Sequence, residues 1–284
     1  MNGIVALAKR NVLCYLRDRA SVLFSVMAVL IVIMLYLLFL RDMLIGSYPD
    51  MEGMPHLIDA WVMAGILGIV PVTASAGSLQ VMIDDRSGGN IRDFLVTPMT
   101  PSAIASGYIL STFAVGMLMS VLATCICLAY LALSGCPLTA SGIMATVVLL
   151  VPSSLSGSII VYAMTSFLRS PGAFSGFFTV ISVLIGFLTG IYMPMGSMPD
   201  AMQAVSGIVP ASHMASLFRN TLADGAMDSV FSGAPVETLE GFRQDMGFDI
   251  SLGGFCFDAG GSILFVLAAT AVFFVIAVAA LRRR

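Results

Sequence analysis

VLFSVMAVLIVIMLYLLFL, residues Val22–Leu40, is a run of 19 residues without a charge. A helix needs about 20 apolar residues to cross the roughly 30 Å hydrocarbon core of a bilayer, so this run predicts a membrane span. Charge-free runs also cover 60–83, 94–168, 170–199 and 259–281, and the 75 residues of 94–168 leave room for two spans. The sequence therefore predicts six transmembrane helices, at roughly 22–40, 60–83, 103–133, 142–168, 173–193 and 260–281.

The composition agrees with an all-α integral membrane protein that forms a single domain over residues 1–284. Of these residues 58% are hydrophobic and 10% are charged, whereas a soluble domain carries about 25% charged residues. Helices are expected because lipid offers no partner for backbone polar groups, and a closed barrel would alternate in hydrophobicity. The first run is not expected to be a signal peptide, because Arg41 and Asp42 follow it instead of a cleavage site.

The basic residues predict the orientation, because short loops rich in Lys and Arg stay in the cytoplasm. With the N-terminus inside, only Arg41, Arg219 and Arg243 of the 13 basic residues lie outside. The ten inside are Lys9, Arg10, Arg17, Arg19, Arg86, Arg92, Arg169, Arg282, Arg283 and Arg284. We therefore expect a multi-pass protein of the plasma membrane with both termini in the cytoplasm.

Residues 1–20 predict an amphipathic helix ahead of the first span. Its apolar side chains fall in one arc at about 100° per residue, which suits a helix lying along the inner membrane surface. Lys9, Arg10, Arg17 and Arg19 would then lie near anionic headgroups. The alternative is an ordinary cytoplasmic start of the chain.

The segment 194–258 is predicted to lie outside. PDAMQAVSG and PASHMASLFRNTLADG each open on a proline and end on a glycine, which predicts two short outer or re-entrant helices between spans five and six. Residues 226–258 are interpreted as a small soluble excursion. Cys136 and Cys256 both fall near the outer face, where a disulfide is conceivable but is not implied by the spacing.

Small residues recur within the spans. We consider two roles for them: packing between helices of one subunit or of a dimer, and lining of a route for substrate. The candidates are Ser75, Ser78, Ser154, Ser158, Gly186 and Gly190.

The sequence lacks the usual motifs for using an energy source and for catalysis. Lys9 is the one lysine, no GxxxxGK[ST] motif is present, and no Asp, Glu, His, Lys or Arg lies in the central part of a predicted span. His56 and His213 fall outside without a catalytic arrangement, and the cysteines show no metal-binding spacing. We therefore expect no enzyme, cofactor, metal site or nucleic-acid partner for this chain, and an energy source in another protein.

The stretch 82–101, MIDDRSGGNIRDFLVTPMTP, is a polar insert between spans two and three on the predicted cytoplasmic side. Asn90 is suited to cap a short helix that ends before Pro98. Ile91, Phe94 and Leu95 would form an apolar face, on a helix too short to be stable without resting on another surface. The insert is either an ordinary solvated loop or a stiff contact for a soluble partner.

This insert resembles the cytoplasmic signature of type-2 ABC transporter permeases, a family that includes drug and antibiotic exporters. The matching residues are Asp84, Asp85, Arg86, Gly88, Gly89, Leu95, Thr97, Pro98 and Ser102. The segment after span five is also similar, through Gly190, Pro194, Pro199, Pro210, Leu217 and Arg219. Where the family usually has glutamates, this chain has Asp85 and Asn90.

The resemblance implies the membrane subunit of an ATP-driven exporter for a drug, antibiotic, peptide or lipid. Two copies would form the pore, and two separate subunits would bind ATP and Mg²⁺. The loop 84–101 would carry the coupling helix, and Pro194, Pro199, Pro210 and Arg219 would belong to an outer gate. The predicted coupling residues are Asp85, Arg86, Gly88, Gly89, Ile91, Arg92, Phe94, Leu95, Thr97 and Pro98.

Two alternatives remain at this point. One is a permease that exports polysaccharide or lipid-linked glycan. The other is a membrane assembly or sensor protein that does not transport and binds a partner through 226–258.

Overall fold

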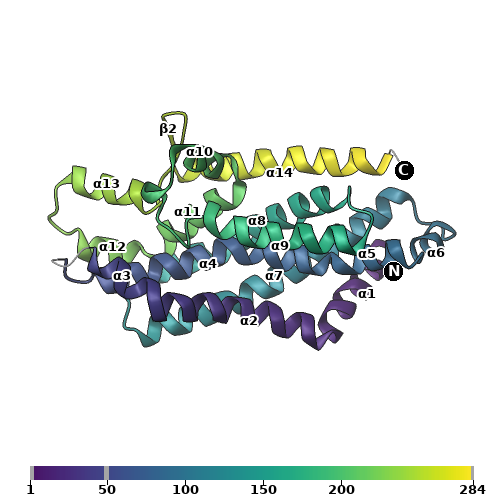
Figure 1. Ribbon diagram of the computed structural model, residues 1–284, viewed down its shortest axis with the longest axis horizontal. Coiled ribbons are helices and arrows are strands. Elements are labelled where there is room, and N and C mark those ends of the chain that lie inside the picture. Colours follow the sequence, from purple (N-terminus) through teal and green to yellow (C-terminus); the bar gives the residue numbers. More distant parts are fainter. Residues whose placement is uncertain (1–2, 48–50, 283–284) are drawn as a thin grey trace.

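The computed structural model describes residues 3–47 and 51–282. Within these ranges the chain is a bundle of helices with one short hairpin (Figure 1). The helices are α1 (Gly3–Arg17), α2 (Arg19–Leu35), α3 (Arg41–Gly46), α4 (Met54–Ser78), α5 (Gln80–Ser87), α6 (Ile91–Leu95), α7 (Pro101–Leu133), α8 (Ala140–Thr165), α9 (Pro171–Leu188), α10 (Asp200–Ile208), α11 (Pro210–Leu222), α12 (Asp224–Val230), α13 (Val236–Asp245) and α14 (Ala259–Arg282). A π turn, η1 (Tyr36–Leu40), joins α2 to α3, and a 3-10 turn, η2 (Met195–Ser197), precedes α10. Strands β1 (Ile250–Leu252) and β2 (Phe255–Phe257) pair antiparallel.

Six helical stretches of the described residues are long and apolar enough to cross a membrane, which confirms the predicted all-α membrane fold. They are Arg19–Gly46, Met54–Ser87, Pro101–Leu133, Ala140–Thr165, Pro171–Leu188 and Ala259–Ala279. Some predicted boundaries were wrong. The second span begins at Met54 instead of residue 60, the fifth ends at Leu188 instead of 193, and Arg19 opens α2 instead of closing the N-terminal helix.

Local chemistry explains where the helices begin and end. The side chains of Thr100, Thr139 and Ser170 accept hydrogen bonds from the first turns of α7, α8 and α9. The fifth span is shorter than predicted because Gly190, with φ of +72°, turns the chain out of the helix two residues after Leu188. An apolar sequence continues beyond that point, so hydrophobicity alone placed the end too late.

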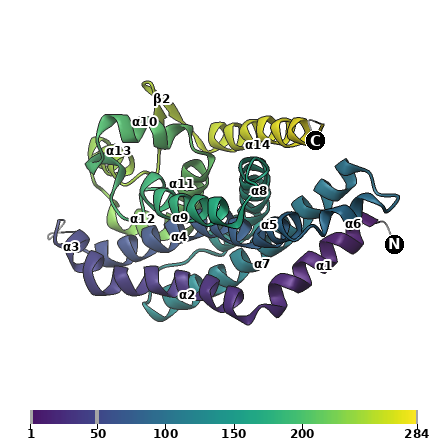
Figure 2. The ribbon, with the colours of Figure 1, turned by 45° about the vertical axis from the view of Figure 1, so that its right-hand side comes forward.

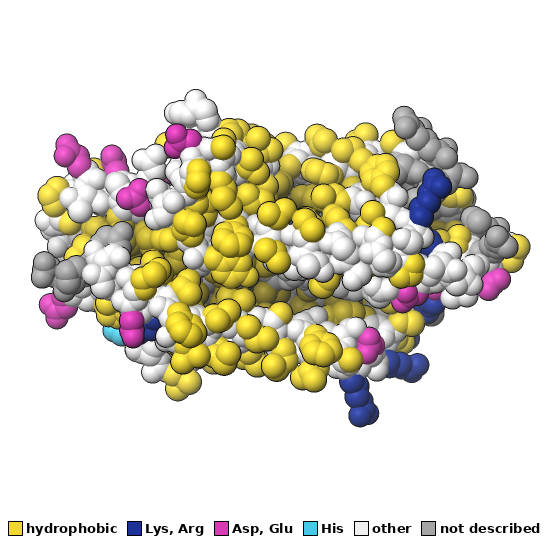
Figure 3. Space-filling view, in the orientation of Figure 1, with side chains coloured by type: hydrophobic (Ala, Val, Ile, Leu, Met, Phe, Trp, Pro, Cys, Tyr) yellow, Lys and Arg dark blue, Asp and Glu magenta, His cyan; other side chains and the backbone are white. Residues whose placement is uncertain are grey.

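The spans run along the long axis of the molecule, with α4 in the middle (Figures 1 and 2). α1, α6 and the last turns of α14 lie at one end, here called the basic end, and α3, α12 and α13 lie at the other, the acidic end. Figure 3 shows a broad hydrophobic belt between them, with most of the visible Lys and Arg side chains at the basic end. Arg283 and Arg284, which were predicted to lie in the cytoplasm, are outside the described residues.

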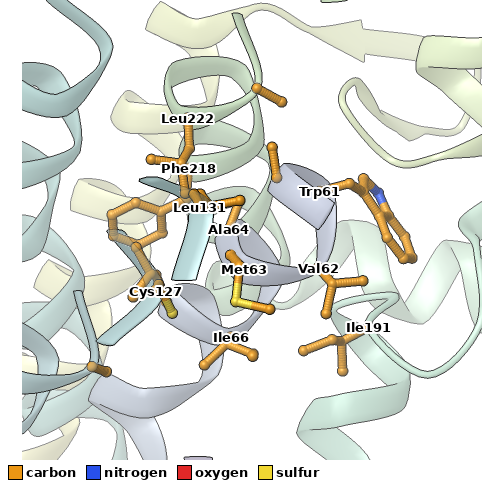
Figure 4. Packing of buried hydrophobic residues seen from close by; sticks show 14 of the residues in the cluster. Trp61, Val62, Met63, Ala64, Ile66, Cys127, Leu131, Ile191, Phe218 and Leu222 are labelled. Carbon is orange, nitrogen blue, oxygen red and sulfur yellow. The ribbon is translucent and has the colours of Figure 1, made fainter. Parts of the chain in front are cut away.

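The core is built around α4. Its residues Trp61 and Met63 have no exposed surface, and neither has Phe218 of the neighbouring helix α11 (Figure 4). Glycines let other helices approach α4 closely. A Cβ added at Gly68 would lie 2.7 Å from the Cβ of Ala215 on α11, and one at Gly157 of α8 would lie 3.1 Å from the carbonyl of Pro71. The first contact holds α11, which was predicted to be an outer helix, against α4, and ten of its 13 residues are buried.

Residues 226–258 do not form a separate soluble excursion. Phe231, Phe242, Met246 and Phe248 are buried, and they belong to the same hydrophobic core as α4. Cys136 and Cys256 are both free thiols and are not paired with each other. Burial raises the pKa of the Cys136 thiol to about 11.

Candidate functional site

The polar insert forms a short helix, α6, that projects from the basic end of the bundle (Figures 1 and 2). Gly89, with φ of +83°, makes the turn into it, and the backbone carbonyl of Asn90 accepts the first helical hydrogen bonds from Asp93 and Phe94. Thr97 Oγ1 donates to the Phe94 carbonyl at 2.6 Å and closes the other end. The predicted short helix is thus confirmed.

α6 carries an unusually exposed apolar residue. Val96, directly after the helix, is 86% exposed, and Thr97 and Pro98 beside it are exposed as well. Phe94 is half-buried and faces inward, where the guanidinium carbon of Arg10 lies 5.7 Å from its ring centroid. The backbones of Arg92 and Leu95 are helical, but their side chains lie outside what the structure describes. The insert therefore offers a small apolar surface on its outer side and is fixed to the chain on its inner side.

Asp85 is the centre of that attachment. Arg10 of α1 forms a two-pronged ion pair with it, in which Nη2 donates to Oδ1 at 2.8 Å. Tyr108 of α7 donates its hydroxyl to Oδ2 at 2.7 Å, and the Asn90 side-chain amide donates to Oδ1 at 3.2 Å. Asp85 itself is only 2% exposed. One buried carboxylate thus ties together α1, α5, α7 and the start of α6.

In this cluster the negative charge of Asp85 is balanced by the positive charge of Arg10. A buried carboxylate is costly unless it is paired and hydrogen-bonded, and Asp85 has three donor residues on its two oxygens. On the other side of the pair, hydrogen bonding to Asp85 raises the pKa of Arg10 above its ordinary value. The cluster is charged and satisfied without any other protein.

Arg86, the next residue, reaches in another direction. Its Nη1 donates to the carbonyls of Thr165, Ser166 and Leu168 at 3.4, 3.3 and 3.2 Å. These carbonyls lie at the end of α8, where a helix has unsatisfied acceptors and a partial negative charge. Arg86 therefore joins the second span to the fourth at the basic end.

The N-terminal helix α1 packs on the bundle with one side. Leu7, Ala8, Asn11 and Tyr15 are buried, and Leu7 fits against α7 where a Cβ at Gly107 would come within 2.8 Å of it. Val5 and Leu16 are 48% and 40% exposed on the outward side, with Lys9 also exposed. The apolar side chains of the predicted helix therefore fall into two groups. Some pack against the rest of the protein, and others are exposed and available to a membrane surface.

The predicted coupling residues are thus used in different ways. Asp85 and Arg86 make bonds within this chain, Gly88 and Gly89 shape the turn, and Val96, which is not among the predicted coupling residues, is an apolar residue open to a partner. Arg10 was predicted only as a lipid-facing residue, yet it holds Asp85. No local signal in the sequence marks that pair, because the two residues are 75 positions apart.

Comparison with known families decides the identity. A family model described as ABC-2 type transporter matches residues 2–223. The chain belongs to the ABC-2 type transporter family. It is therefore a membrane permease subunit of an ABC transporter, and this confirms the resemblance seen in the sequence. No curated protein matches the sequence significantly.

The permease has a groove of about 620 Å³ along the membrane-spanning part of the bundle. Its walls come from α2, α4, α7 and α9, and it extends from Tyr15 and Gln80 near the basic end to Ile191 and Tyr192 toward the acidic end. Of the described residues that line it, none is Asp, Glu, Lys, Arg or His. Its polar groups are hydroxyls and one amide, including Ser25, Thr73 and Ser182.

The small residues predicted to line a route lie elsewhere in the bundle. Ser75, Ser154 and Ser158 have no exposed surface, and none of the six candidates lines the groove. Ser78 donates to the Ser75 carbonyl, and a Cβ at Gly186 would collide with the ring of Tyr192. These contacts are those of close packing, and the two roles considered for the six residues, helix packing and lining of a substrate route, stay predictions.

At the acidic end, Arg219 of α11 is fully buried and is held by carbonyl oxygens. Its Nη2 donates to Thr189 and Gly190 at 2.8 and 3.2 Å, and Nη1 donates to Gly247 at 3.1 Å. The guanidinium also lies 4.7 Å from the ring centroid of Trp61. Burial lowers the pKa of Arg219 to about 9, so it stays protonated at neutral pH.

These acceptors are the ends of two helices, since Thr189 follows α9 and Gly247 comes just after α13. The negative ends of two helix dipoles therefore neutralise Arg219. Of the other predicted gate residues, Pro199 precedes α10 and Pro210 opens α11, as the sequence indicated, and Pro194 precedes η2.

Proposed function

We propose that this permease is the membrane subunit of an ATP-driven exporter and that α6 is its coupling helix. The observation that carries the proposal is the combination at α6 of an exposed apolar tip, Val96, with a rigid base made by the Asp85 cluster. An exposed tip offers a soluble protein a contact, and a rigid base passes a displacement on to α1, α5 and α7. A flexible solvated loop would need neither.

The orientation follows from the basic residues. Short cytoplasmic loops are enriched in Lys and Arg, so the basic end, with α6 and both termini, faces the cytoplasm. The expected location is the plasma membrane. There α6 meets a separate subunit that binds ATP and Mg²⁺, and two such subunits work with two copies of this chain.

The groove suits the cargo of such an exporter. Ligand sites of about 300–1,000 Å³ with apolar walls and a few polar groups are usual for small molecules, and this groove falls within that range. Because its described lining carries no formal charge, a hydrophobic or amphipathic cargo, such as a drug, antibiotic, peptide or lipid, fits it better than a strongly charged one. The groove opens along the belt that contacts lipid, so cargo enters from the membrane and leaves outward.

The test is a pair of matched substitutions. Val96→Asp places a charge on the tip of α6 without removing a buried contact, and Val236→Asp makes the same change on α13 at the acidic end, where Val236 is 67% exposed. Each variant is co-expressed with the ATP-binding subunits encoded by neighbouring genes and is purified through a tag on the permease. We expect Val96→Asp to lose the ATP-binding subunit and Val236→Asp to keep it.

Equal retention by both variants would refute the coupling role of α6. Failure of the unmodified permease to retain any ATP-binding subunit, or to show vanadate-sensitive transport of labelled amphiphiles with one, would refute the exporter proposal.

A further inference from the structure

A second buried carboxylate lies near the acidic end of the same span that carries Asp85. Asp59 of α4 has no exposed surface. Arg41 donates to it through Nε at 2.9 Å and Nη2 at 3.4 Å, and Tyr36 donates its hydroxyl at 2.6 Å. Tyr130 of α7 lies within electrostatic reach of both charges. The sequence does not mark this group, because Asp59 lies directly before the charge-free run 60–83.

The π turn explains how two side chains of one helix reach one carboxylate. Tyr36 and Arg41 are five residues apart, and in an α-helix that spacing turns them about 140° away from each other. In η1 the amide of Arg41 donates to the carbonyl of Tyr36, so the turn holds one extra residue and brings both side chains near the same face. The local irregularity therefore serves the contact with Asp59.

The two carboxylates form matching clusters. Each is paired with an arginine and accepts a bond from a tyrosine hydroxyl: Asp59 from Arg41 and Tyr36, and Asp85 from Arg10 and Tyr108. Both arginines come from the N-terminal segment α1–α3, and both carboxylates from the second span. The carboxylates are 26 residues apart on α4 and α5, which corresponds to at most about 39 Å at 1.5 Å per residue, a length comparable to the thickness of a bilayer.

Between the clusters, the N-terminal segment is packed lightly. In α2 only Val29 and Ile33 are buried, whereas most of α4 is. α2 is also one wall of the groove, through residues such as Phe24, Val29 and Ile31. A helix with so few buried contacts takes its position chiefly from its ends.

We infer that α1–α3 is a strap fastened to the second span at both membrane interfaces, and that Tyr36, Arg41 and Asp59 are positioning residues for the wall of the groove. This inference rests on the proposed function for the use of the groove, but the geometry concerns the permease alone. The inner fastening lies beside α6, so α1 and α6 are displaced together. The outer fastening lies far from α6 and sets the separation of α2 from α9.

The test measures that separation in the permease without any ATP-binding subunit. Spin labels are placed at Met34→Cys on α2 and Val183→Cys on α9, both 51% exposed, after the five native cysteines are changed to alanine. Distances are recorded by pulsed electron paramagnetic resonance in nanodiscs that hold one copy. A reference pair, Val148→Cys and Leu264→Cys, reports on α8 and α14, away from the strap.

We expect Arg41→Gln and Asp59→Asn to shift the Met34–Val183 distances to larger values and broaden them, while the reference pair stays unchanged. Arg41→Lys, which keeps the charge, should restore most of the original distribution. Deletion of Leu38 should leave it unaltered, because Tyr36 and Arg41 then stand four residues apart and share a face of a regular α-helix.

An unchanged distribution in both Arg41→Gln and Asp59→Asn would overturn the inference. So would equal broadening of the reference pair, which would mean general loss of packing, or a broadened distribution after deletion of Leu38. Loss of ATP-binding subunit contact at α6 would not alter these distances, so the inference and the proposed function fail separately.

Discussion

The Asp85 cluster makes a quantitative prediction about the base of α6. Changing Arg10 to Gln removes the ion pair and leaves Asp85, 2% exposed, with Tyr108 and Asn90 as its remaining donors. Breaking a fully buried pair in this way costs about 3–5 kcal/mol, and an exposed pair contributes at most about 1 kcal/mol. The Arg10 side chain is 39% exposed, so water screens the pair in part, and we expect a loss of about 2 kcal/mol.

The assay is reversible unfolding of the permease by SDS in mixed micelles, applied as a double-mutant cycle. Arg10→Gln, Asp85→Asn and the double variant are compared with Lys9→Gln, an exposed neighbour on the same helix that should change stability by less than about 0.5 kcal/mol. Because Asp85→Asn removes the uncompensated charge, the double variant should lose less stability than the sum of the two single losses, by about 1–2 kcal/mol. Additive losses within about 0.5 kcal/mol would refute the claim that Arg10 acts on Asp85.

Three further predictions concern the rest of the bundle. Arg219→Met leaves the carbonyls of Thr189, Gly190 and Gly247 without donors, and it should lower the free energy of unfolding by about 3 kcal/mol in the same titration; a neutral result would show that water replaces the guanidinium. Burial lowers the pKa of His213, whose ring nitrogens contact Ser262 and the Gly207 carbonyl, so stability should fall as the pH drops below about 6.5. His213→Gln should remove that dependence when unfolding is measured from pH 7.5 to 5, and an equally steep decline in the variant would exclude His213 as its source. Gly68→Ala should destabilise by about 1–3 kcal/mol because its Cβ meets Ala215, whereas Gly77→Ala, with no atom within 4 Å, should be neutral or slightly stabilising; similar stabilities for the two would contradict the close helix contact.

The membrane fold could be predicted from the sequence because the signal is local. Each span lies in a continuous apolar run, and bilayer thickness sets its length, so five runs, of which 94–168 has room for two helices, predict six spans. The short helix ahead of Pro98 was also predictable from local backbone preferences, whereas Asn90, the expected side-chain cap, donates its amide to Asp85. Where the boundaries were wrong, a single residue overrode hydrophobicity, as Gly190 did at the end of α9.

The site was less predictable because its contacts join distant parts of the chain. Arg10 and Asp85 are separated by 75 residues, and Arg41 and Asp59 by 18 residues across a turn. A charged residue read alone looks like the end of a span or the start of a loop. The structure shows instead that Asp59 lies inside a helix that begins at Met54 and that it is paired with Arg41. The groove depends on the same distant packing, so its lining could not be read from the small residues of individual spans.

The position of Arg219 also constrains how the protein is made. Two of its acceptors, Thr189 and Gly190, precede it in the chain, but the third, Gly247, is synthesised 28 residues later. Until that part of the chain has been made, Nη1 has no acceptor at Gly247 and the indole N–H of Trp61 has no acceptor at the Met246 carbonyl. The segment around Gly247 therefore completes these bonds late in synthesis, and a chain cut between α11 and α13 is expected to hold an incompletely bonded arginine.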